Sequence, residues 1–295
     1  METPEKLLQQ LKNLDSLKSI VKTMKALSAA NIVQYDAAVA SLAEYYRTIQ
    51  MGLQVVLKDY DENKDISTEF DGHQATIIFG TDHGLCGRFN ENIVNYALEN
   101  NENKSQEAGE NISFLVVGSR AASLLENSGR SVEDILLLPG SAKGLSLIVQ
   151  TILLKIDEWR RTGKLAHVNI FYNRYDSMGT YEPMRIDLLP LEIDDFRPQR
   201  DFKWPSRSLP TYTMDSQPLL GALLRQYFFV TIFRACAESQ ASEHYTRLNA
   251  MHGAERNIDS RFDELTENYR RVRQTAITNE LLDVVSGYDA TEESR

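Results

Sequence analysis

Proline is scarce in this sequence, and the eight prolines are unevenly placed. Only one of them precedes Pro139, and none follows Pro218. A proline inside a helix removes a backbone hydrogen bond and clashes with the preceding turn. The two ends of the chain are therefore free to form long, uninterrupted helices. Glycine is rare in the C-terminal stretch as well, since only Gly221 and Gly253 occur between residues 218 and 286.

Cysteine and histidine are also rare, and their spacing matches no common metal-binding pattern. The two cysteines, Cys86 and Cys236, lie far apart and form no CxxC pair. Four of the five histidines show no metal-ligand spacing: His73, His167, His244 and His252. We therefore expect no metal site. A reducing compartment is the simplest interpretation of two unpaired cysteines.

Positive charge is in deficit, which limits the possible partners. The chain carries 32 Lys and Arg against 42 Asp and Glu, giving a formal net charge of −10 and a pI near 5.1. This balance argues against sequence-independent binding to nucleic acid or anionic lipid. No stretch approaches the roughly 18 apolar residues of a transmembrane helix, and residues 1–12 lack the pattern of a signal or transit peptide. At 42% hydrophobic and 25% charged residues, the chain is expected to be soluble, either cytosolic or peripherally bound.

The C-terminal stretch 218–287 carries a heptad pattern. Alternating steps of three and four residues keep one face of a helix turned toward a partner. As one helix of roughly 65–70 residues, it would span on the order of 100 Å. That length exceeds the diameter of about 50 Å expected for a compact chain of this size. The predicted stripe comprises Ala241, His244, Leu248, Met251, Glu255, Ile258, Phe262, Leu265, Tyr269, Val272 and Ala276.

The N-terminal segment 1–58 has a second heptad stripe of about seven heptads. Lys18, Lys25 and Ser28 interrupt its apolar character. These residues either fix the register or form a solvated face; alternatively, they contact another protein. The full stripe is Leu7, Leu11, Leu14, Lys18, Val21, Lys25, Ser28, Ile32, Tyr35, Val39, Leu42, Tyr46, Ile49, Leu53 and Val56.

The middle of the chain, 73–210, alternates short β-branched runs with helical patterns, which predicts an α/β domain with a mainly parallel, Rossmann-like sheet. Strands are expected at 75–79, 112–117, 168–172 and 184–189, and helices at 88–100, 120–127 and 142–161. Polar connections are expected at 59–72 and 101–111, with an extended linker at 196–216. The predicted fold is thus an α/β domain inserted into a long antiparallel two-helix coiled coil, with the segments 1–58, 73–210 and 218–287.

The two long helices differ in length, so part of the second one is expected to lack a partner within the chain. If both helices leave the domain together, Leu7 lies near Tyr269, and residues 272–285 extend beyond the coil. An apolar tip of this size predicts a binding partner. The basic residues Arg270, Arg271 and Arg273 either pair with Glu264 and Glu267 on a solvated face or meet acidic residues of that partner.

The segment 80–87 (GTDHGLCG) follows a strand and precedes a helix. Its G-x3-G-x2-G spacing matches neither the dinucleotide fingerprint nor the phosphate-binding P-loop. A structural turn is the favoured interpretation. The alternative is that His83 and Cys86 form a nucleophile pair, although no residue that would orient the histidine can be identified.

Three blocks of sequence together resemble one known family. They are Leu17–Ala30 (LKSIVKTMKALSAA), Thr81–Asn90 (TDHGLCGRFN) and Arg273–Gly287 (RQTAITNELLDVVSG), and Arg247–Asn257 is a weaker match. This layout is similar to that of the gamma subunit of F-type rotary ATP synthases, the central shaft. The sequence departs from the family pattern at Asn31, Arg88, Phe89, His252 and Asn279, which indicates a divergent or alternative bacterial form.

The resemblance implies a rotor that couples a membrane ion-translocating ring to ATP synthesis or hydrolysis on a hexamer of alpha and beta subunits. It implies a chain that is not an enzyme, binds no cofactor and lies peripherally at the cytoplasmic face of the bacterial inner membrane, with an epsilon-type subunit as a further partner. A non-rotary coiled-coil scaffold or regulator is the alternative. The expected contacts with the hexamer are Met24, Lys25, Arg273, Gln274, Thr278, Leu281, Leu282 and Val285.

Overall fold

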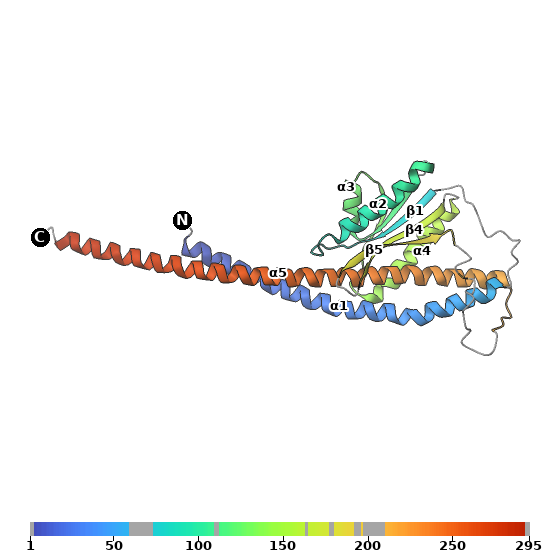
Figure 1. Ribbon diagram of the computed structural model, residues 1–295, viewed down its shortest axis with the longest axis horizontal. Helices are drawn as coiled ribbons and strands as arrows, with labels where there is room; N and C mark the ends of the chain where they lie inside the picture. Colours follow the sequence, from blue (N-terminus) through green and yellow to red (C-terminus); the bar gives the residue numbers. More distant parts are fainter. Residues whose placement is uncertain are drawn as a thin grey trace. The chain divides into compact units, whose positions relative to one another are not determined.

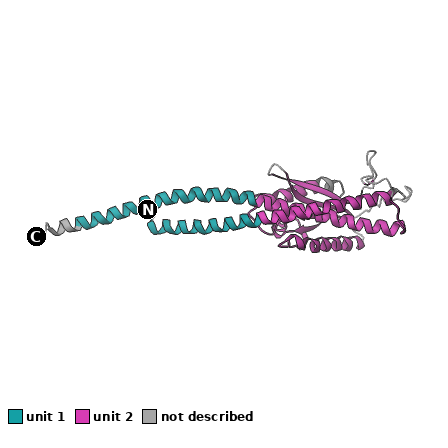
Figure 2. Ribbon diagram, turned by 90° about the horizontal axis from the view of Figure 1, so that it is seen from below, with its two compact units in different colours: residues 1–28, 248–295 teal, residues 29–247 magenta. Residues whose placement is uncertain are grey.

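The computed structural model describes residues 3–58, 73–108, 112–162, 165–176, 180–191, 196 and 210–292. The elements, in order, are α1 (Pro4–Lys58), β1 (His73–Phe79), α2 (Phe89–Ala108), β2 (Ile112–Val117), α3 (Ser119–Asn127), β3 (Val132–Leu136), a short 3-10 helix η1 (Ala142–Gly144), α4 (Leu145–Arg161), β4 (Leu165–Tyr175), β5 (Tyr181–Leu189) and α5 (Ser216–Glu292) (Figure 1). They form two compact units, Ala29–Arg247 and the described part of Met1–Ser28 with Leu248–Arg295 (Figure 2). Both α1 and α5 contribute residues to each unit.

The larger unit is built on a five-stranded sheet with the order β3-β2-β1-β4-β5. The pairs β1–β2, β1–β4 and β2–β3 are parallel, whereas β4–β5 is antiparallel. The prediction of a mainly parallel sheet is therefore confirmed. The sequence analysis missed β3, because its segment VEDIL places two carboxylates in the middle of an edge strand and shows no alternation.

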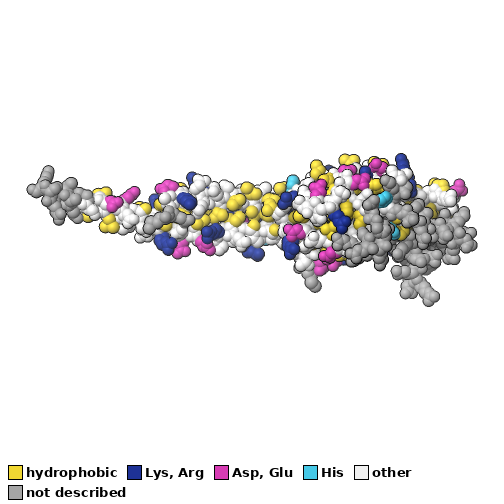
Figure 3. Space-filling model, turned by 90° about the horizontal axis from the view of Figure 1, so that it is seen from above, with side chains coloured by type: hydrophobic (Ala, Val, Ile, Leu, Met, Phe, Trp, Pro, Cys, Tyr) yellow, Lys and Arg dark blue, Asp and Glu magenta, His cyan; other side chains and the backbone are white. Residues whose placement is uncertain are grey.

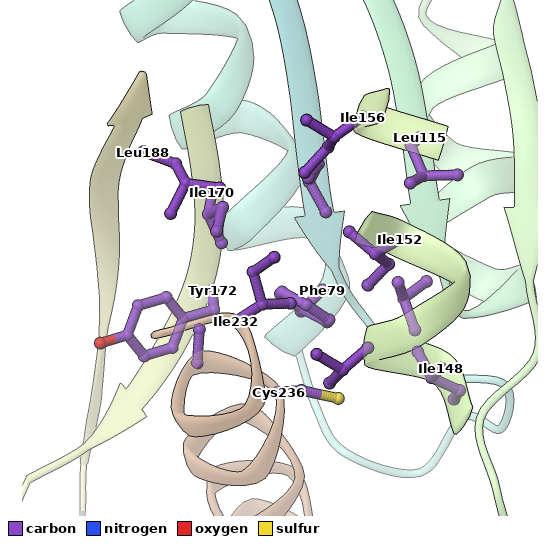
Figure 4. Close-up of a cluster of buried hydrophobic side chains, with 14 of the residues drawn as sticks. Phe79, Leu115, Ile148, Ile152, Ile156, Ile170, Tyr172, Leu188, Ile232 and Cys236 are labelled. Carbon is purple, nitrogen blue, oxygen red and sulfur yellow. The ribbon is translucent and has the colours of Figure 1, made fainter. Parts of the chain in front are cut away.

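Helices cover both faces of this sheet. On one face, α4 and α5 pack against the strands, and the buried cluster there contains Phe79, Ile170, Ile152 and Ile232 (Figure 4). On the other face, α2 and α3 enclose a second cluster around Ile78. Residues of α5 thus complete the hydrophobic core of the α/β fold. This arrangement explains why the strands are apolar on both faces.

Two expectations about the ends of helices were wrong. The expected loop at 101–111 is helical as far as Ala108, because Glu, Asn, Lys and Gln are compatible with a helix and no glycine occurs before Gly109. Helix α5 starts at Ser216 rather than at Pro218, since proline is tolerated in the first turn. The expected connection 59–72 and most of the expected linker, 197–209, lie outside the described residues.

The smaller unit is an antiparallel pair formed by the first part of α1 and the last part of α5 (Figures 1 and 2). Leu7, Met251 and Leu265 are buried in it. Every other residue of this unit that the two heptad stripes predicted to face inward is at least half-buried. The phase of both stripes is therefore confirmed along the coil.

Ion pairs show the register of this coil. Lys25 Nζ lies 2.5 Å from Glu255 Oε2, and Lys18 Nζ lies 2.5 Å from Asp259 Oδ1. At this register Leu7 falls opposite a point within about one turn of Tyr269, as expected from the helix lengths. The lysines that interrupt the apolar stripe of α1 therefore meet carboxylates of α5, which supports their role in fixing the register.

One stretch of α5 is more apolar than the sequence analysis allowed. By length and composition alone it is long and apolar enough to cross a membrane, with a mean hydropathy of 1.3 over 18 residues. A core helix of a soluble protein passes the same test. The apolar residues Leu220, Val230 and Ile232 of α5 are buried within the protein, and 33% of the apolar window is buried, so packing accounts for part of this composition.

Candidate partner-binding tip and the loop that grips α5

The last described turns of α5 expose large apolar side chains. The exposed fraction is 48% for Ile277, 62% for Leu281, 58% for Leu282, 71% for Val284 and 55% for Val285. We call residues 277–286 the tip. Val272 and Ala276, just before it, are still half-buried, so the exposed end starts at 277, whereas the helix lengths predicted a start at 272. Figure 3 shows apolar side chains at the surface of this end of α5. Ile277, Leu281 and Val284 follow one another at steps of four and three residues, so they share one face of the helix, and an exposed apolar face is typical of an interaction site.

Polar residues border the tip and are accessible. Arg273, Gln274 and Thr278 are exposed, and the Thr278 hydroxyl donates to the carbonyl oxygen of Gln274 at 2.9 Å. The guanidinium of Arg271 donates to the Asn268 side chain at 3.0 Å. These groups lie beside the apolar residues on the same helix, so one partner surface can contact both.

The carboxylate expected to pair with the basic cluster has another partner. Glu264 accepts a 2.8 Å hydrogen bond from Arg261, one turn before it. A carboxylate accepts several hydrogen bonds, so both interpretations of Arg270, Arg271 and Arg273 stay open.

The two candidate contacts on α1 differ in their surroundings. Met24 is half-buried in the coil. The ammonium of Lys25 is already engaged by Glu255, and this ion pair lowers the pKa of the Glu255 carboxyl. Any external carboxylate that contacts Lys25 would have to compete with Glu255. The structure thus brings the tip residues of α5 together but does not bring Met24 and Lys25 into the same patch.

The segment 80–87 forms a turn rather than a phosphate-binding loop. Asn90 holds it from α2, because its side-chain oxygen accepts from the Thr81 backbone N–H at 2.9 Å and its amide donates to the Thr81 hydroxyl at 2.9 Å. Gly87 and Leu85 both have positive φ, 59° and 66°. A Cβ added to Gly80 would lie 2.2 Å from Ala121 Cβ. These glycines serve the conformation and the close packing of the turn.

The possible nucleophile pair has no supporting geometry. The Cys86 sulfur is buried and lies 3.9 Å from the carbonyl oxygen of His83, whose side chain is exposed. Burial raises the pKa of the Cys86 thiol, which lowers its reactivity. Among the described residues, no group of three or more His, Cys, Asp and Glu side chains is placed to hold a metal ion.

A buried polar cluster, missed by the sequence analysis, joins this turn to α5. Arg247 Nη2 lies 2.5 Å from Glu243 Oε1 and donates to the carbonyl oxygens of His83 at 3.3 Å and Gly84 at 3.4 Å. Glu243 also accepts from Gln240 at 2.9 Å. The (i, i+4) spacing of an acidic and a basic residue, beside a predicted stripe residue, was the signal that could have revealed this pair.

His244 extends the cluster to α1. Its Nδ1 lies 3.4 Å from Arg247 Nη1 and accepts, because a guanidinium can only donate. Its Nε2 faces the Asn31 amide at 3.2 Å, and its ring stacks on Tyr35 with centroids 5.5 Å apart. Burial, together with the charge of Arg247, lowers the pKa of His244 to about 4. Burial raises the pKa of Glu243, and the Arg247 guanidinium opposes that effect.

The larger unit combines an α/β sheet with parts of two long helices, and the smaller unit is a two-helix coil in which α5 exposes the tip. Comparison with known proteins identifies the family. A family model described as ATP synthase matches residues 3–291. The chain therefore belongs to the ATP synthase gamma-subunit family, as its sequence motifs indicated.

Curated relatives named ATP synthase gamma chain match this chain over almost its whole length. The ATP synthase gamma chain of Heliobacterium modesticaldum is 28% identical over 287 residues, covering 95% of this chain and 96% of the relative. That of Janthinobacterium sp. is 27% identical over 282 residues, covering 94% and 96%.

Solved structures share the fold. The central stalk and c-ring structure of the Tetrahymena thermophila mitochondrial ATP synthase contains a chain with a TM-score of 0.56 and 18% identity, covering 80% of this chain and 99% of that one. A rotor chain of the Euglena gracilis mitochondrial ATP synthase also has a TM-score of 0.56 and 18% identity, covering 93% and 98%.

Proposed function

We propose that this chain is the central rotor shaft of an F-type ATP synthase and that its tip turns within a socket formed by the alpha and beta subunits. The observation that carries the proposal is the exposure of the apolar residues at 277–286, beyond the end of the coil. Such a surface is costly in water and becomes favourable when a partner covers it. The similarity to ATP synthase gamma chains supports a hexamer of alpha and beta subunits as that partner.

The proposed contacts with the hexamer follow from what each residue can offer. Leu281, Leu282 and Val285 supply apolar area, while Gln274 and Thr278 offer hydrogen-bonding groups along the same helix. Arg273 would face carboxylates of the socket, since a guanidinium pairs with carboxylates through two parallel hydrogen bonds. A mixed surface of this kind suits a contact that changes during rotation. Met24 and Lys25 are proposed as contacts on α1, with Lys25 exchanging between Glu255 and the hexamer.

The chain itself is proposed to be non-catalytic, with ATP synthesis or hydrolysis on the beta subunits. An epsilon-type subunit and the membrane ring are its proposed partners at the α/β domain. The complex would place the chain peripherally at the cytoplasmic face of the bacterial inner membrane. The coupling ion, proton or sodium, is chosen by subunits other than this one.

Truncation of the tip tests this function. Removal of residues 277–295 should leave the α/β domain folded but reduce assembly with the hexamer and ATP-driven ion pumping by the complete enzyme in lipid vesicles. A shorter truncation, removing only 287–295, is the matched control, because it keeps Leu281, Leu282 and Val285. Ion pumping that is unchanged by the longer truncation would contradict the proposed socket contact. Failure of the full-length chain to co-purify with ATPase subunits would contradict the rotor function itself and favour a scaffold.

A further inference from the structure

The buried cluster at Arg247 has no role in the tip contact, although it joins two blocks of sequence that lie far apart. The turn 80–87 belongs to the sheet, and Arg247 lies on α5, more than 160 residues later in the chain. The Arg247 guanidinium binds the carbonyl oxygens of His83 and Gly84 while it pairs with Glu243. One side chain therefore fixes the backbone of the turn to the long helix.

This cluster is not explained by stability alone. The Arg247 and Glu243 side chains are only 7% and 6% exposed, and Arg247 Nε has no hydrogen-bond partner among the described residues. Removing two charges from water is costly, and well-packed apolar residues in their place are often equally or more stabilising. The preceding turns of α5 bury the apolar residues Ala237 and Ala241 in the sheet core, and they bury the small polar residues Ser239 and Ser242 as well. The distinctive contribution of the charged groups is therefore the direction of their hydrogen bonds, a property that apolar packing lacks.

The charged side chains of Arg247 and Glu243 form directional hydrogen bonds. Apolar contacts such as those of Ile232 resist separation of α5 from the sheet, but they are non-directional. Hydrogen bonds weaken steeply when their angle is lost, and the planar guanidinium binds several acceptors in a fixed geometry. Leu85, with its φ of 66°, lies next to the two carbonyls that are held. An L-residue in this conformation persists only where its surroundings impose it.

We propose that Arg247 is a positioning residue that locks the α/β sheet to α5 at one angle, so that torque on the helix is passed to the sheet without slip. This inference rests on the proposed rotor function. His244 adds a second direction to the lock, because it connects Arg247 to Asn31 and stacks on Tyr35 of α1. The sheet, α1 and α5 are thereby joined within one cluster of the larger unit.

Substitutions in the complete ATP synthase test the lock. Arg247→Met removes every hydrogen bond of the Arg247 guanidinium but leaves the Tyr172–Glu238 hydrogen bond between the sheet and α5 in place, and Arg247→Lys keeps the charge but loses the planar fork. The double variant Glu243→Gln/Arg247→Gln leaves no unpaired buried charge, so it remains informative if the single variants fail to fold. The matched control is Arg261→Met. Arg261 forms an (i, i+3) pair with Glu264 on the same helix, but its side chain is 64% exposed.

Two activities are measured in lipid vesicles that contain the assembled enzyme: ATP hydrolysis and ATP-driven ion uptake, with proton and sodium both monitored. We expect Arg247→Met and the double variant to hydrolyse ATP while ion uptake per ATP hydrolysed is lost. We expect Arg247→Lys to give a partial loss and Arg261→Met to give none.

Equal ion uptake per ATP in the double variant and the unmodified enzyme would overturn the lock. So would a parallel loss of hydrolysis, uptake and thermal stability, since that pattern describes a purely structural residue. A failure of the unmodified chain to support ATP-driven uptake would instead contradict the rotor function, so the two failures are distinguishable.

Discussion

Truncation of Ile232 tests whether α5 is part of the α/β core. Ile232 is fully buried in α5 and packs in the cluster that contains Phe79, Ile152 and Tyr172 (Figure 4). Replacing it with alanine removes three carbon atoms and leaves a cavity, which costs about 2–5 kcal/mol. Replacing it with valine removes one carbon and costs about 0.5–1.5 kcal/mol. The expected order of stability is thus unmodified protein, Ile232→Val, Ile232→Ala.

Thermal unfolding of the isolated chain measures this series. For a unit of this size, 1 kcal/mol lowers the Tm by about 2–4 °C, so Ile232→Ala should lower it by about 4–20 °C. Leu147→Ala is the control, because Leu147 on α4 is 70% exposed and its truncation should change the free energy of unfolding by less than about 0.5 kcal/mol.

Two outcomes would refute the reasoning. Equal melting temperatures for Ile232→Ala and Leu147→Ala would mean that α5 does not pack on the sheet. A cooperative thermal unfolding transition in a fragment that contains only residues 73–191 would mean that the sheet folds without α5. The structure predicts instead that this fragment fails to fold, because it lacks the α1 and α5 residues of the core.

Two further predictions concern the coil. Phe262→Asp places a charge at a half-buried position of the heptad stripe and should destabilise the coil by about 1–3 kcal/mol; an unchanged melting curve would show that the phase of the stripe is wrong. Glu255→Gln should reduce stability at neutral pH and make little difference in acid. The folded-state pKa of Glu255 is lowered by Lys25, so its contribution is present above the ordinary value of 4.5 and is lost as pH falls through the lower folded value. Melting curves of both proteins from neutral pH to pH 3 measure the difference, and a gap that persists in acid would contradict the ion pair.

The sequence was most informative where residues repeat with a period. Both heptad stripes correctly predicted which side chains of the coil face inward, because each position is reinforced by its neighbours three and four residues away. The difference in helix length then predicted that Leu281 and Leu282 would be exposed. Strand β2 was predicted with its observed ends, since ISFLVV is a continuous apolar run.

The sequence was least informative where a residue's role depends on distant contacts. In the sequence, Glu243 and Arg247 look like an ordinary surface ion pair. Their burial could not be predicted, because the carbonyl groups that accept from Arg247 lie in the turn 80–87, far away along the chain. Strand β3 was missed for a similar reason, since its pairing with β2 compensates for a sequence with weak strand propensity. The last part of α2, from Asn101 to Ala108, was predicted as a loop because its composition is polar, but it is helical.

The composition of the sheet core has a consequence for synthesis on the ribosome. Tyr35 and Ile232 belong to the same buried cluster, although nearly two hundred residues separate them. Local folding of the nascent chain cannot complete this cluster, because its last contributors, such as Ala241, emerge only after most of the protein has been made. The N-terminal helix must wait through most of translation with its apolar stripe uncovered. The core of the α/β unit is therefore completed only late in translation, once the α5 residues up to Ala241 have emerged.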